Sequence, residues 1–371
     1  MTDKRLRLAL IFGGRSGEHE VSIQSARSVL ESLDPQRYEI FQIGITHSGQ
    51  WLTGTDARQD FENGTLETLS ACTLLPDTSY RSALFLIKPD LRMQLVSEID
   101  VVFPILHGTF GEDGTIQGLL ELSDVAYVGA GVTGSSVGMD KGIFKDVMRS
   151  NGIPTVESII VLRSEIESEI TTVIQNAEAV APYPLFVKPA NLGSSVGISK
   201  CNNRSDLVEG LKEASAFDRR ILVERGVDAR EIEVSVLGND FPQASVPGEI
   251  LPSREYYSYE SKYVDGTSGL LIPAPLPAEL AERIRSIAVK AYKAIDCAGM
   301  ARVDFFVERG TDEVLLNEIN TIPGFTKISM YPKLWNASGL SYPALVDRLV
   351  ELAVERKLDR DRTERRFRSN Q

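Results

Sequence analysis

The feature that most constrains the fold is the order of apolar patterns at the start of the chain. Residues 7–14 form a short apolar run that ends in two glycines, residues 21–34 carry apolar side chains at helical spacing, and residues 38–46 form a second apolar run. Strand, helix and strand in this order make a βαβ unit, in which a crossover helix joins two parallel strands. We therefore predict an N-terminal α/β domain with a parallel sheet, to which residues 98–108 and 125–131 add strands.

The length of the chain predicts more than one domain. Domains usually hold about 150 residues, so 371 residues suggest two or three of them. The stretch 253–269 is long, polar and rich in tyrosine, which is typical of a functional lid loop. We divide the chain into an N-terminal α/β domain (1–138), a central α+β unit (139–228), a C-terminal unit (229–355) that contains the lid loop, and a charged, solvated tail (356–371).

Composition excludes some classes of function. The net charge is −12, so the chain lacks the excess of basic residues on which nucleic-acid binding depends. Three widely spaced cysteines without metal-ligand spacing fit a reducing compartment, and we expect a cytoplasmic protein. The N-terminal apolar run is too short for a signal peptide, and no stretch approaches the roughly 18 apolar residues of a membrane span. We expect neither nucleic acid nor a membrane as a partner.

Polar side chains recur at alternate positions of a late hairpin, in the segments ARVDFFVE and VLLNEIN. If both segments are strands, Arg302 and Asp304 share one face, and so do Glu318 and Asn320. Asp and Asn are uncommon in strands, which favours a functional reason over the alternative of a polar face turned to water. Carboxylate and amide oxygens suit Mg²⁺ better than zinc, and Mg²⁺ usually also contacts phosphates. The hairpin therefore predicts a metal-nucleotide site with one adjacent cation.

A second candidate for phosphate binding is the segment NLGSSVG, residues 191–197. Its small residues could wrap a polyphosphate with successive backbone N–H groups, but an ordinary hairpin turn explains the same sequence. It is not a Walker loop, because the Gly-Lys-Ser/Thr ending is missing and the segment joins two expected strands. Lys188 precedes it in an apolar strand, where we expect a lysine to neutralise an anionic group.

The N-terminal segment GGRSGEHEVS is a third candidate site. Its glycine spacing does not match G-x-G-x-x-G, and the second strand ends without the acidic residue that binds ribose, so we reject a dinucleotide site. Glu18 precedes the first helix and could either receive a cationic amine or stabilise the helix N-terminus. His107 follows a strand and could contact a ligand or be structural. His19 and His107 are too few and too scattered to predict a histidine metal site.

These segments belong to nine blocks that together resemble the D-alanine–D-alanine ligases of the ATP-grasp superfamily. The resemblance extends over nearly the whole chain and implies a two-part ATP-grasp α+β fold after the N-terminal domain. It also implies ATP-dependent joining of two D-alanines through an acyl phosphate, for peptidoglycan precursor synthesis. Another ATP-grasp carboxylate–amine ligase and a nucleotide-binding regulator without turnover stay open as alternatives. The blocks are GGRSGEHEVS, HGTFGEDG, GSSVGMDK, FVKPANLGSSVG, ILVERGVDAREIEVSV, YYSYESKY, ARVDFF, NEINTIPGFT and SMYPKLW.

The resemblance implies a homodimer. It also implies which residues bind the two substrates and stabilise the reaction between them. Glu18 would bind the ammonium group of the first D-alanine, and Arg302 with the N–H of Gly324 would form the oxyanion site. Tyr263 in the lid favours D-alanyl-D-alanine over D-alanyl-D-lactate as the product. The other residues implied for this chemistry are Ser194, hydrogen-bonded with Tyr263 to Glu18, and Ser329, on the carboxylate of the second D-alanine.

The resemblance also implies a set of ligands for ATP and two Mg²⁺ or Mn²⁺ ions. Asp304, Glu318 and Asn320 would hold the two ions, with Glu318 bridging them. The residues implied for the nucleotide are Lys141, Lys188, Gly193, Ser194, Ser195, Glu224, Arg225, Val227, Glu231 and Lys262.

Overall fold

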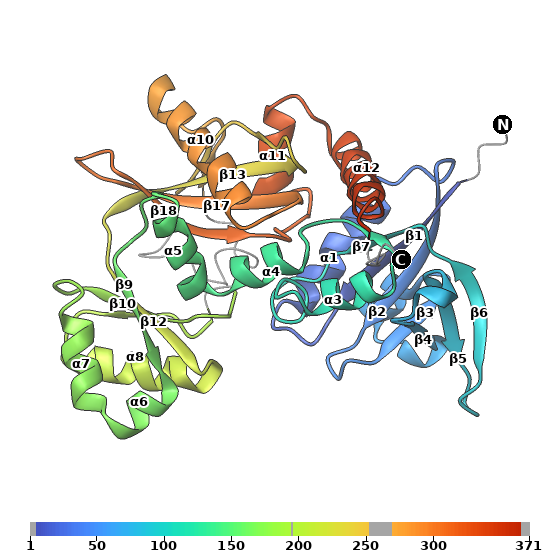
Figure 1. The fold of residues 1–371 in the computed structure, drawn as a ribbon, viewed down its shortest axis with the longest axis horizontal. Coiled ribbons are helices and arrows are strands. Elements are labelled where there is room, and N and C mark those ends of the chain that lie inside the picture. The colour runs from blue at the N-terminus through green and yellow to red at the C-terminus, as the bar shows by residue number, and fades with distance from the viewer. Residues whose placement is uncertain (1–4, 194–195, 252–268, 365–371) are drawn as a thin grey trace, which may run out of the picture.

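The computed structural model describes residues 5–193, 196–251 and 269–364, and within these ranges the chain forms three sheets (Figure 1). The first of these belongs to the N-terminal unit, the second to the central unit and the third to the C-terminal unit. No helix in the described ranges is both long and apolar enough to cross a membrane.

The N-terminal unit is built on an eight-stranded sheet with the order β6-β5-β4-β3-β2-β1-β7-β8. β2, β1, β7 and β8 pair in parallel, which confirms the expected parallel sheet, whereas β3 to β6 extend the sheet as antiparallel strands. The sequence analysis did not anticipate this extension, because its strands are short and β6 is largely exposed, so an apolar pattern is weak there.

The elements of this unit have the following bounds. The strands are β1 (Leu6–Gly13), β2 (Tyr38–Ile45), β3 (Trp51–Gly54), β4 (Ser70–Leu74), β5 (Ala83–Ile87), β6 (Met93–Glu98), β7 (Val101–Pro104) and β8 (Ala126–Tyr127). The α-helices are α1 (His19–Leu30), α2 (Ala57–Asn63), α3 (Thr115–Leu122) and α4 (Val132–Met139), and short 3₁₀ turns span Leu66–Thr68 and Thr78–Tyr80.

The central unit has a four-stranded antiparallel sheet with the order β11-β10-β12-β9. Helices α7 and α8 cover one face, where Leu207 and Leu211 share a buried cluster with Val187 and Val223. The Gly-rich segment that follows β10 leads into its antiparallel neighbour β11, as expected for a connection between two strands. The bounds are α5 (Lys141–Ser150), β9 (Ser158–Leu162), α6 (Arg163–Ser168), α7 (Ile170–Glu178), β10 (Leu185–Pro189), β11 (Ser199–Cys201), α8 (Arg204–Phe217) and β12 (Arg220–Arg225).

The C-terminal unit has a six-stranded sheet in which β16-β15-β13-β17-β18 are successive neighbours and β14 pairs with β13. β17 and β18 are the predicted hairpin, and one face of it packs through Val303 and Phe305 against α5 and α10. The bounds are β13 (Ala229–Gly238), β14 (Gln243–Ala244), β15 (Gly248–Leu251), β16 (Gly269–Leu271), α10 (Ala278–Ala294), β17 (Gly299–Glu308), β18 (Val314–Asn320), α11 (Met330–Ala337) and α12 (Tyr342–Arg360).

Helix α12 returns to the N-terminal sheet, as Figure 1 shows. Leu345 and Leu349 are fully buried in one apolar cluster with Leu10 and Phe103, which lie in β1 and β7. Burial of apolar side chains contributes roughly 25 cal/mol per Å² of apolar surface, so this shared core is a major link between the first and last units of the chain. The two units are therefore held in a fixed relation by the same hydrophobic core.

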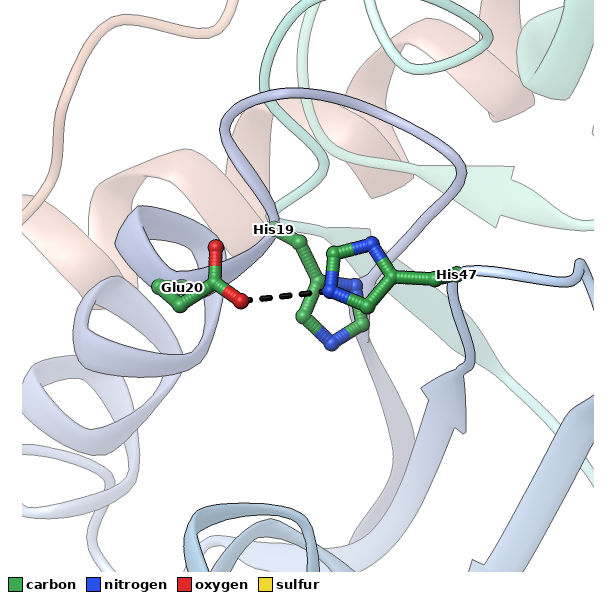
Figure 2. A group of neighbouring side chains, drawn as sticks. All are labelled: His19, Glu20 and His47. Atoms are coloured by element: carbon green, nitrogen blue, oxygen red, sulfur yellow. Dashed lines mark hydrogen bonds and ion pairs between the residues drawn. The ribbon is translucent and has the colours of Figure 1, made fainter.

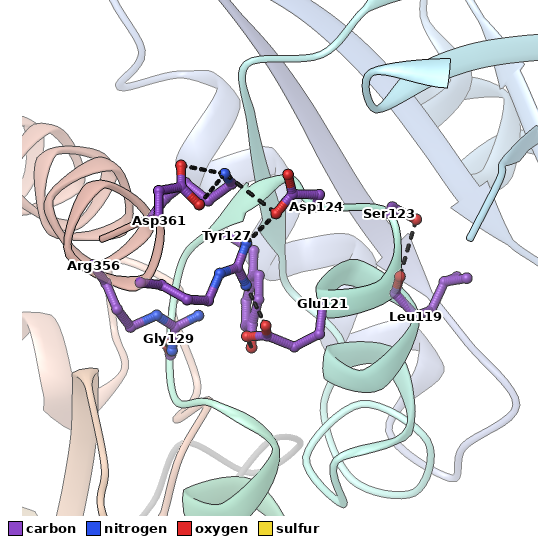
Figure 3. A network of polar contacts seen from close by, with 10 residues as sticks. Leu119, Glu121, Ser123, Asp124, Tyr127, Gly129, Arg356 and Asp361 are labelled. Atoms are coloured by element: carbon purple, nitrogen blue, oxygen red, sulfur yellow. Dashed lines mark hydrogen bonds and ion pairs between the residues drawn. The ribbon is translucent and has the colours of Figure 1, made fainter. Parts of the chain in front are cut away.

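The basic end of α12 also contacts the N-terminal unit (Figure 3). The guanidinium of Arg356 lies 4.1 Å from the ring centre of Tyr127 and donates to the carbonyl of Gly129 at 2.9 Å. Arg360 forms ion pairs with Glu121 and Asp124. A solvated tail was expected to begin at residue 356, and this expectation is wrong for the last turns of α12, because acidic side chains of another unit, distant in sequence, hold these arginines.

We predict that replacing Leu349 by alanine lowers the free energy of unfolding by about 2–5 kcal/mol, because it leaves a cavity in the shared core. Leu358→Ala is the matched control, since Leu358 lies in the same helix with 63% of its surface exposed, and its effect should stay within about 0.5 kcal/mol. Urea unfolding followed by circular dichroism measures both. Equal unfolding midpoints for the two variants would show that α12 is not part of the core.

Candidate active site

A cavity of about 840 Å³ is lined by side chains of all three units. Its lining includes every sequence-predicted site residue that the structure describes: Glu18, Lys141, Lys188, Gly193, Glu224, Arg225, Val227, Glu231, Arg302, Asp304, Glu318, Asn320, Gly324 and Ser329. Four further predicted residues, Ser194, Ser195, Lys262 and Tyr263, lie outside the described residues, as does nearly all of the expected lid 253–269. The structure thus brings the described candidates to one place, and their individual roles stay predictions.

The hairpin presents its polar face to this cavity. Arg302 lies opposite Asn320, and Asp304 lies opposite Glu318, so the period of two places these four side chains on one face. A β-bulge follows Asp304, because Phe305 pairs with Leu316 and one residue of β18 is left over. The bulge keeps Phe305 and Leu316 in the core while Glu318 lines the cavity, which is the usual effect of a bulge beside a site.

Positive side chains compensate the carboxylates of this face. Arg302 donates from Nε and Nη2 to the two oxygens of Asp304 at 2.8 and 2.7 Å, and its Nε lies 3.0 Å from Glu233. The Nζ of Lys141 lies 3.5 Å from Glu318. Two largely shielded carboxylates beside each other need such compensation, because burying an unpaired charge is costly. The donor set of carboxylate and amide oxygens therefore fits a hard divalent cation, for which Asp304, Glu318 and Asn320 are the candidate ligands.

A buried ion-pair cluster also lines the cavity. Glu224 pairs with Lys188 and, at 3.0 Å, with Lys145, whose Nζ also donates to the carbonyl of Val156 at 3.2 Å. Burial alone would raise the pKa of Glu224, but the two ammonium groups outweigh it and lower this pKa to about 2. Burial likewise acts to lower the pKa of Lys188, and Glu224 outweighs it, so this pKa is raised. The anionic partner expected for Lys188 is thus Glu224 of the neighbouring strand.

Lys145 is a residue that the sequence analysis missed. It lies in α5 one turn after Lys141 and shares the buried face of that helix with Met148. Its side chain is 1% exposed, and its ion pair with Glu224 connects it to the site. The sequence did contain an indication of this role, because Lys145 falls among the apolar positions of an amphipathic helix. A buried ammonium group without a partner would be strongly destabilising, so a lysine there predicts a buried carboxylate partner.

Glu18 lies at the start of α1, buried and facing the cavity. Its side chain makes no capping hydrogen bond to α1 and lines the cavity, a position in which it could receive a cationic amine, while its place at the helix N-terminus also allows the dipole interaction. Two glycines approach its carboxylate closely: a Cβ at Gly108 would lie 2.5 Å, and a Cβ at Gly193 would lie 2.9 Å, from Oε2. Gly193 therefore lies against Glu18, and larger residues at Gly108 or Gly193 would displace the Glu18 carboxylate.

Three buried side chains of the N-terminal unit hold the turn that follows β18. Glu112 accepts from the N–H of Ile322 at 3.0 Å, His107 lies with Nδ1 2.9 Å from the carbonyl of Ile322, and Ser25 accepts from the N–H of Phe325 at 3.3 Å. The N–H of residue 326 binds Ser329, and residue 323 is proline. Gly324 thus lies in a turn that these bonds hold against the cavity, and its oxyanion role stays a prediction.

The same contacts favour the structural alternative for His107. Its Nε2 lies 2.9 Å from the hydroxyl of Ser25 in the same unit, and its Nδ1 binds the carbonyl of Ile322 in the C-terminal unit. Burial lowers the pKa of His107, which keeps the ring neutral. The ring also lines the cavity, so a role for it at the ligand stays a prediction.

Glu112, which the sequence analysis did not single out, has an unusual pKa. Both of its oxygens accept backbone N–H groups, from Gly108 at 2.9 Å and from Ile322. Burial, followed by the nearby carboxylate of Glu18, raises the pKa of Glu112 to about 8. A carboxyl group that holds the cavity wall together is thus poised to gain or lose a proton near neutral pH.

The expectation that His19 and His107 are too scattered for a metal site did not consider His47. The structure places His19 against His47, with ring centres 3.8 Å apart (Figure 2). Sequence spacing could not indicate this, because the contact joins two different connections of the N-terminal sheet.

The fold and the site together define an ATP-grasp ligase. One mixed sheet and two antiparallel sheets contribute to a cavity that holds paired carboxylates, lysines and an arginine. Comparisons with known proteins identify the family. Profiles described as D-ala D-ala ligase N-terminus and D-ala D-ala ligase C-terminus match residues 7–130 and 147–351. The chain belongs to the D-alanine–D-alanine ligase family.

Similar proteins cover nearly the whole chain. It is 47% identical over 365 residues to the D-alanine–D-alanine ligase of Natranaerobius thermophilus, covering 98% of this chain and 99% of that protein. It is 51% identical over 354 residues to the Thermoanaerobacter sp. ligase of the same name, covering 95% and 97%. Among solved structures, the D-alanine-D-alanine ligase from Coxiella burnetii has a TM-score of 0.82 at 38% identity, covering 96% of each chain. The VanG D-Ala:D-Ser ligase from Enterococcus faecalis has a TM-score of 0.84 at 35% identity, covering 94% and 100%.

We predict that Glu112→Gln makes the stability of the protein less dependent on pH. With a pKa of about 8 in the folded protein against an ordinary 4.5, Glu112 contributes stability that is complete below pH 4.5 and is lost as the pH rises through 8. The thermal midpoint of the wild-type protein should therefore fall more steeply between about pH 6 and about pH 8.5 than that of the variant. Glu67→Gln, at an exposed site, should keep the wild-type slope. If the thermal midpoints of wild type and Glu112→Gln change with pH at the same rate, the pKa of Glu112 is not raised.

Proposed function

We propose that this chain joins two D-alanine molecules to D-alanyl-D-alanine with conversion of ATP to ADP and phosphate, the reaction for which its family is named. The observation that carries the proposal is the single cavity in which Glu18, the Arg302–Gly324 pair and the Asp304–Glu318 face come together. An amine receptor, an oxyanion site and a cation site in this arrangement are the parts that carboxylate activation followed by amide formation needs. A sensor that only binds nucleotide has no use for an oxyanion site, which argues against a regulator without turnover.

ATP and a divalent cation follow from the family, and we propose two Mg²⁺ or Mn²⁺ ions held by Asp304, Glu318 and Asn320. The pairing of both carboxylates with Arg302 and Lys141 supports this assignment, because this face already attracts positive charge. When bound, the ions would neutralise charge on the transferring phosphoryl group. Lys141 and Lys188 would contribute further positive charge there, and Lys188 stays protonated because Glu224 is its neighbour.

The remaining nucleotide contacts are proposed from the strand that carries Glu224. Since the carboxylate of Glu224 is committed to two lysines, the backbone between Glu224 and Val227 is the better partner for the adenine edge. Glu231 would accept hydrogen bonds from the ribose hydroxyls. Gly193, Ser194, Ser195 and Lys262 are proposed to close over the phosphates.

In the first step, the carboxylate of one D-alanine attacks the γ-phosphate of ATP, which gives an acyl phosphate and ADP. Glu18 holds the ammonium group of this D-alanine and so orients its carboxylate toward the nucleotide end of the cavity. Such alignment lowers the barrier because the reaction inside the site is effectively unimolecular. The protein supplies positioning and positive charge in this step and no nucleophile.

In the second step, the amine of the other D-alanine attacks the acyl carbon, and phosphate leaves with one oxygen of the original carboxylate. Negative charge develops on the carbonyl oxygen, where Arg302 and the N–H of Gly324 would stabilise it. Arg302 is held by Asp304 and Glu233, yet its guanidinium has five donors and can bind an oxyanion as well. Ser329 lies beside Gly324, which supports its proposed contact with the carboxylate of the second D-alanine.

We predict release of phosphate from ATP and Mg²⁺ that depends on D-alanine and is much weaker with L-alanine or D-lactate as acceptor. A coupled assay for phosphate, with mass spectrometry of the product, measures it. ATP binding without release would favour the regulator, and release only with other acids would favour another ATP-grasp ligase. Because the VanG enzyme is a D-Ala:D-Ser ligase, D-serine is the informative additional acceptor, and we expect it to be the poorer one.

We predict that Glu318→Gln lowers kcat at least about 100-fold and leaves the thermal midpoint nearly unchanged. Loss of a residue that only hydrogen-bonds a metal ligand already lowers activity by up to about 100-fold, and loss of the ligand itself should lower it at least as much. Glu313→Gln is the control, because Glu313 is an exposed carboxylate of the same hairpin. Wild-type turnover in Glu318→Gln would refute the role of Glu318 at the metal site.

We also predict that Arg302→Met lowers kcat by about 10²–10³-fold through loss of the oxyanion donor.

A further inference from the structure

Two connections of the N-terminal sheet meet at its carboxyl edge and bring three metal-binding side chains together. His19 and Glu20 open α1, which follows β1, and His47 lies in the turn between β2 and β3. β1 and β2 are parallel neighbours, with Gly13 opposite Ile45, so the segments that leave them emerge side by side. Figure 2 shows the two imidazole rings overlapping beside the carboxylate.

The geometry of the group is close to that of a metal site. The rings of His19 and His47 are stacked with an interplanar angle of 23°, and Nε2 of His47 lies 3.2 Å from Oε1 of Glu20. One ligand atom from each residue can be chosen so that all lie within 4.8 Å of one another. In a tetrahedral Zn²⁺ site the ligand atoms lie about 2.0–2.2 Å from the ion and so roughly 3.3–3.6 Å from one another, and binding would turn the His47 ring out of its stack on His19 until both nitrogens point at one ion. Glu20 and His47 are exposed and can make this movement, whereas His19 is buried.

The environment of His19 favours a ligand at its second nitrogen. Its Nδ1 lies 2.8 Å from the carbonyl of Gly14, an acceptor, so Nδ1 carries the proton and Nε2 carries the lone pair. Metal-binding histidines characteristically donate their other ring N–H to a backbone carbonyl or carboxylate, which fixes the ring and its tautomer. Gly13 leaves room for this ring, because a Cβ at that position would lie only 3.0 Å from its Cε1.

We propose that His19, Glu20 and His47 form a binding site for a divalent transition-metal ion, with Zn²⁺ as its representative. Two imidazole nitrogens and one carboxylate oxygen suit Zn²⁺ and its neighbours far better than Mg²⁺, which prefers oxygen ligands only. The site is therefore separate in chemistry from the oxygen-rich face of Asp304 and Glu318. A bound ion would link the start of α1, one residue from Glu18, to the turn between β2 and β3.

Few other nitrogen or sulfur ligands of this chain compete for such an ion. The sequence has three histidines, and the third, His107, uses both ring nitrogens within the protein. It has three cysteines, all buried as free thiols. Burial raises the pKa of Cys72 and of Cys297 to about 12 and that of Cys201 to about 11, so none of them offers a thiolate at neutral pH.

The test is calorimetric titration of the untagged full-length protein with ZnCl₂ in the presence of excess Mg²⁺, followed by thermal unfolding with and without Zn²⁺. We expect one Zn²⁺ per chain and a higher thermal midpoint when it is bound, because the ion binds the folded state. His47→Ala should weaken binding at least about tenfold and abolish the shift in midpoint, while Ser48→Ala, in the same turn, should leave both unchanged. Cobalt should give the absorption spectrum of a nitrogen-ligated ion in wild type and not in His47→Ala.

Glu20→Gln adds a second variant at an exposed position, and it should also weaken Zn²⁺ binding. Equal Zn²⁺ affinity in wild type and His47→Ala, or no Zn²⁺ binding to wild type, would overturn the proposal. Turnover with Mg²⁺ is measured separately on the same proteins, so a failure of this site is distinguishable from a failure of the proposed ligase activity.

Discussion

The cavity depends on one constraint: the C-terminal unit must stay docked on the N-terminal sheet. Two kinds of contact impose it. An apolar core shared by α12 and the central strands of the N-terminal sheet supplies most of the affinity, because burial of apolar surface is the largest favourable contribution to such association. The buried side chains of Ser25, His107 and Glu112 then fix the position of the turn after β18. Without the docking, Glu18 and Arg302 would belong to separate surfaces.

Charge compensation is the second principle of the site. Three carboxylates of the cavity wall face a cation or backbone N–H groups: Glu224 faces two lysines, Asp304 faces Arg302, and Glu112 accepts two N–H groups. These pairs cost desolvation energy and add little to stability by themselves. Their value lies in holding charged side chains at defined places before substrates arrive, which is what stabilisation of a developing charge requires.

Much of the site could be predicted from local patterns. The hairpin face is an example, because the period of two in a strand decides from sequence alone that Arg302 and Asp304 point the same way. Lys145, Glu112 and His47 were missed for a common reason. Each acquires its significance from a partner far away in the sequence, such as Glu224 for Lys145 or Ile322 for Glu112, and no short window of sequence contains that partner. The arginines at the end of α12 were misjudged in the same way, since an amphipathic pattern does not show that acidic side chains of another unit lie opposite.

The sequence by itself determined the local elements, the parallel start of the chain and the polar face of the hairpin, because backbone periodicity and turn-forming residues act over a few residues. Its motifs also determined the family. Only the tertiary structure decided that Glu18 lines the cavity, that His107 binds the turn after β18, and that His19 meets His47. These outcomes depend on which surfaces are buried together, and burial is decided by the packing of whole units, which no local pattern encodes.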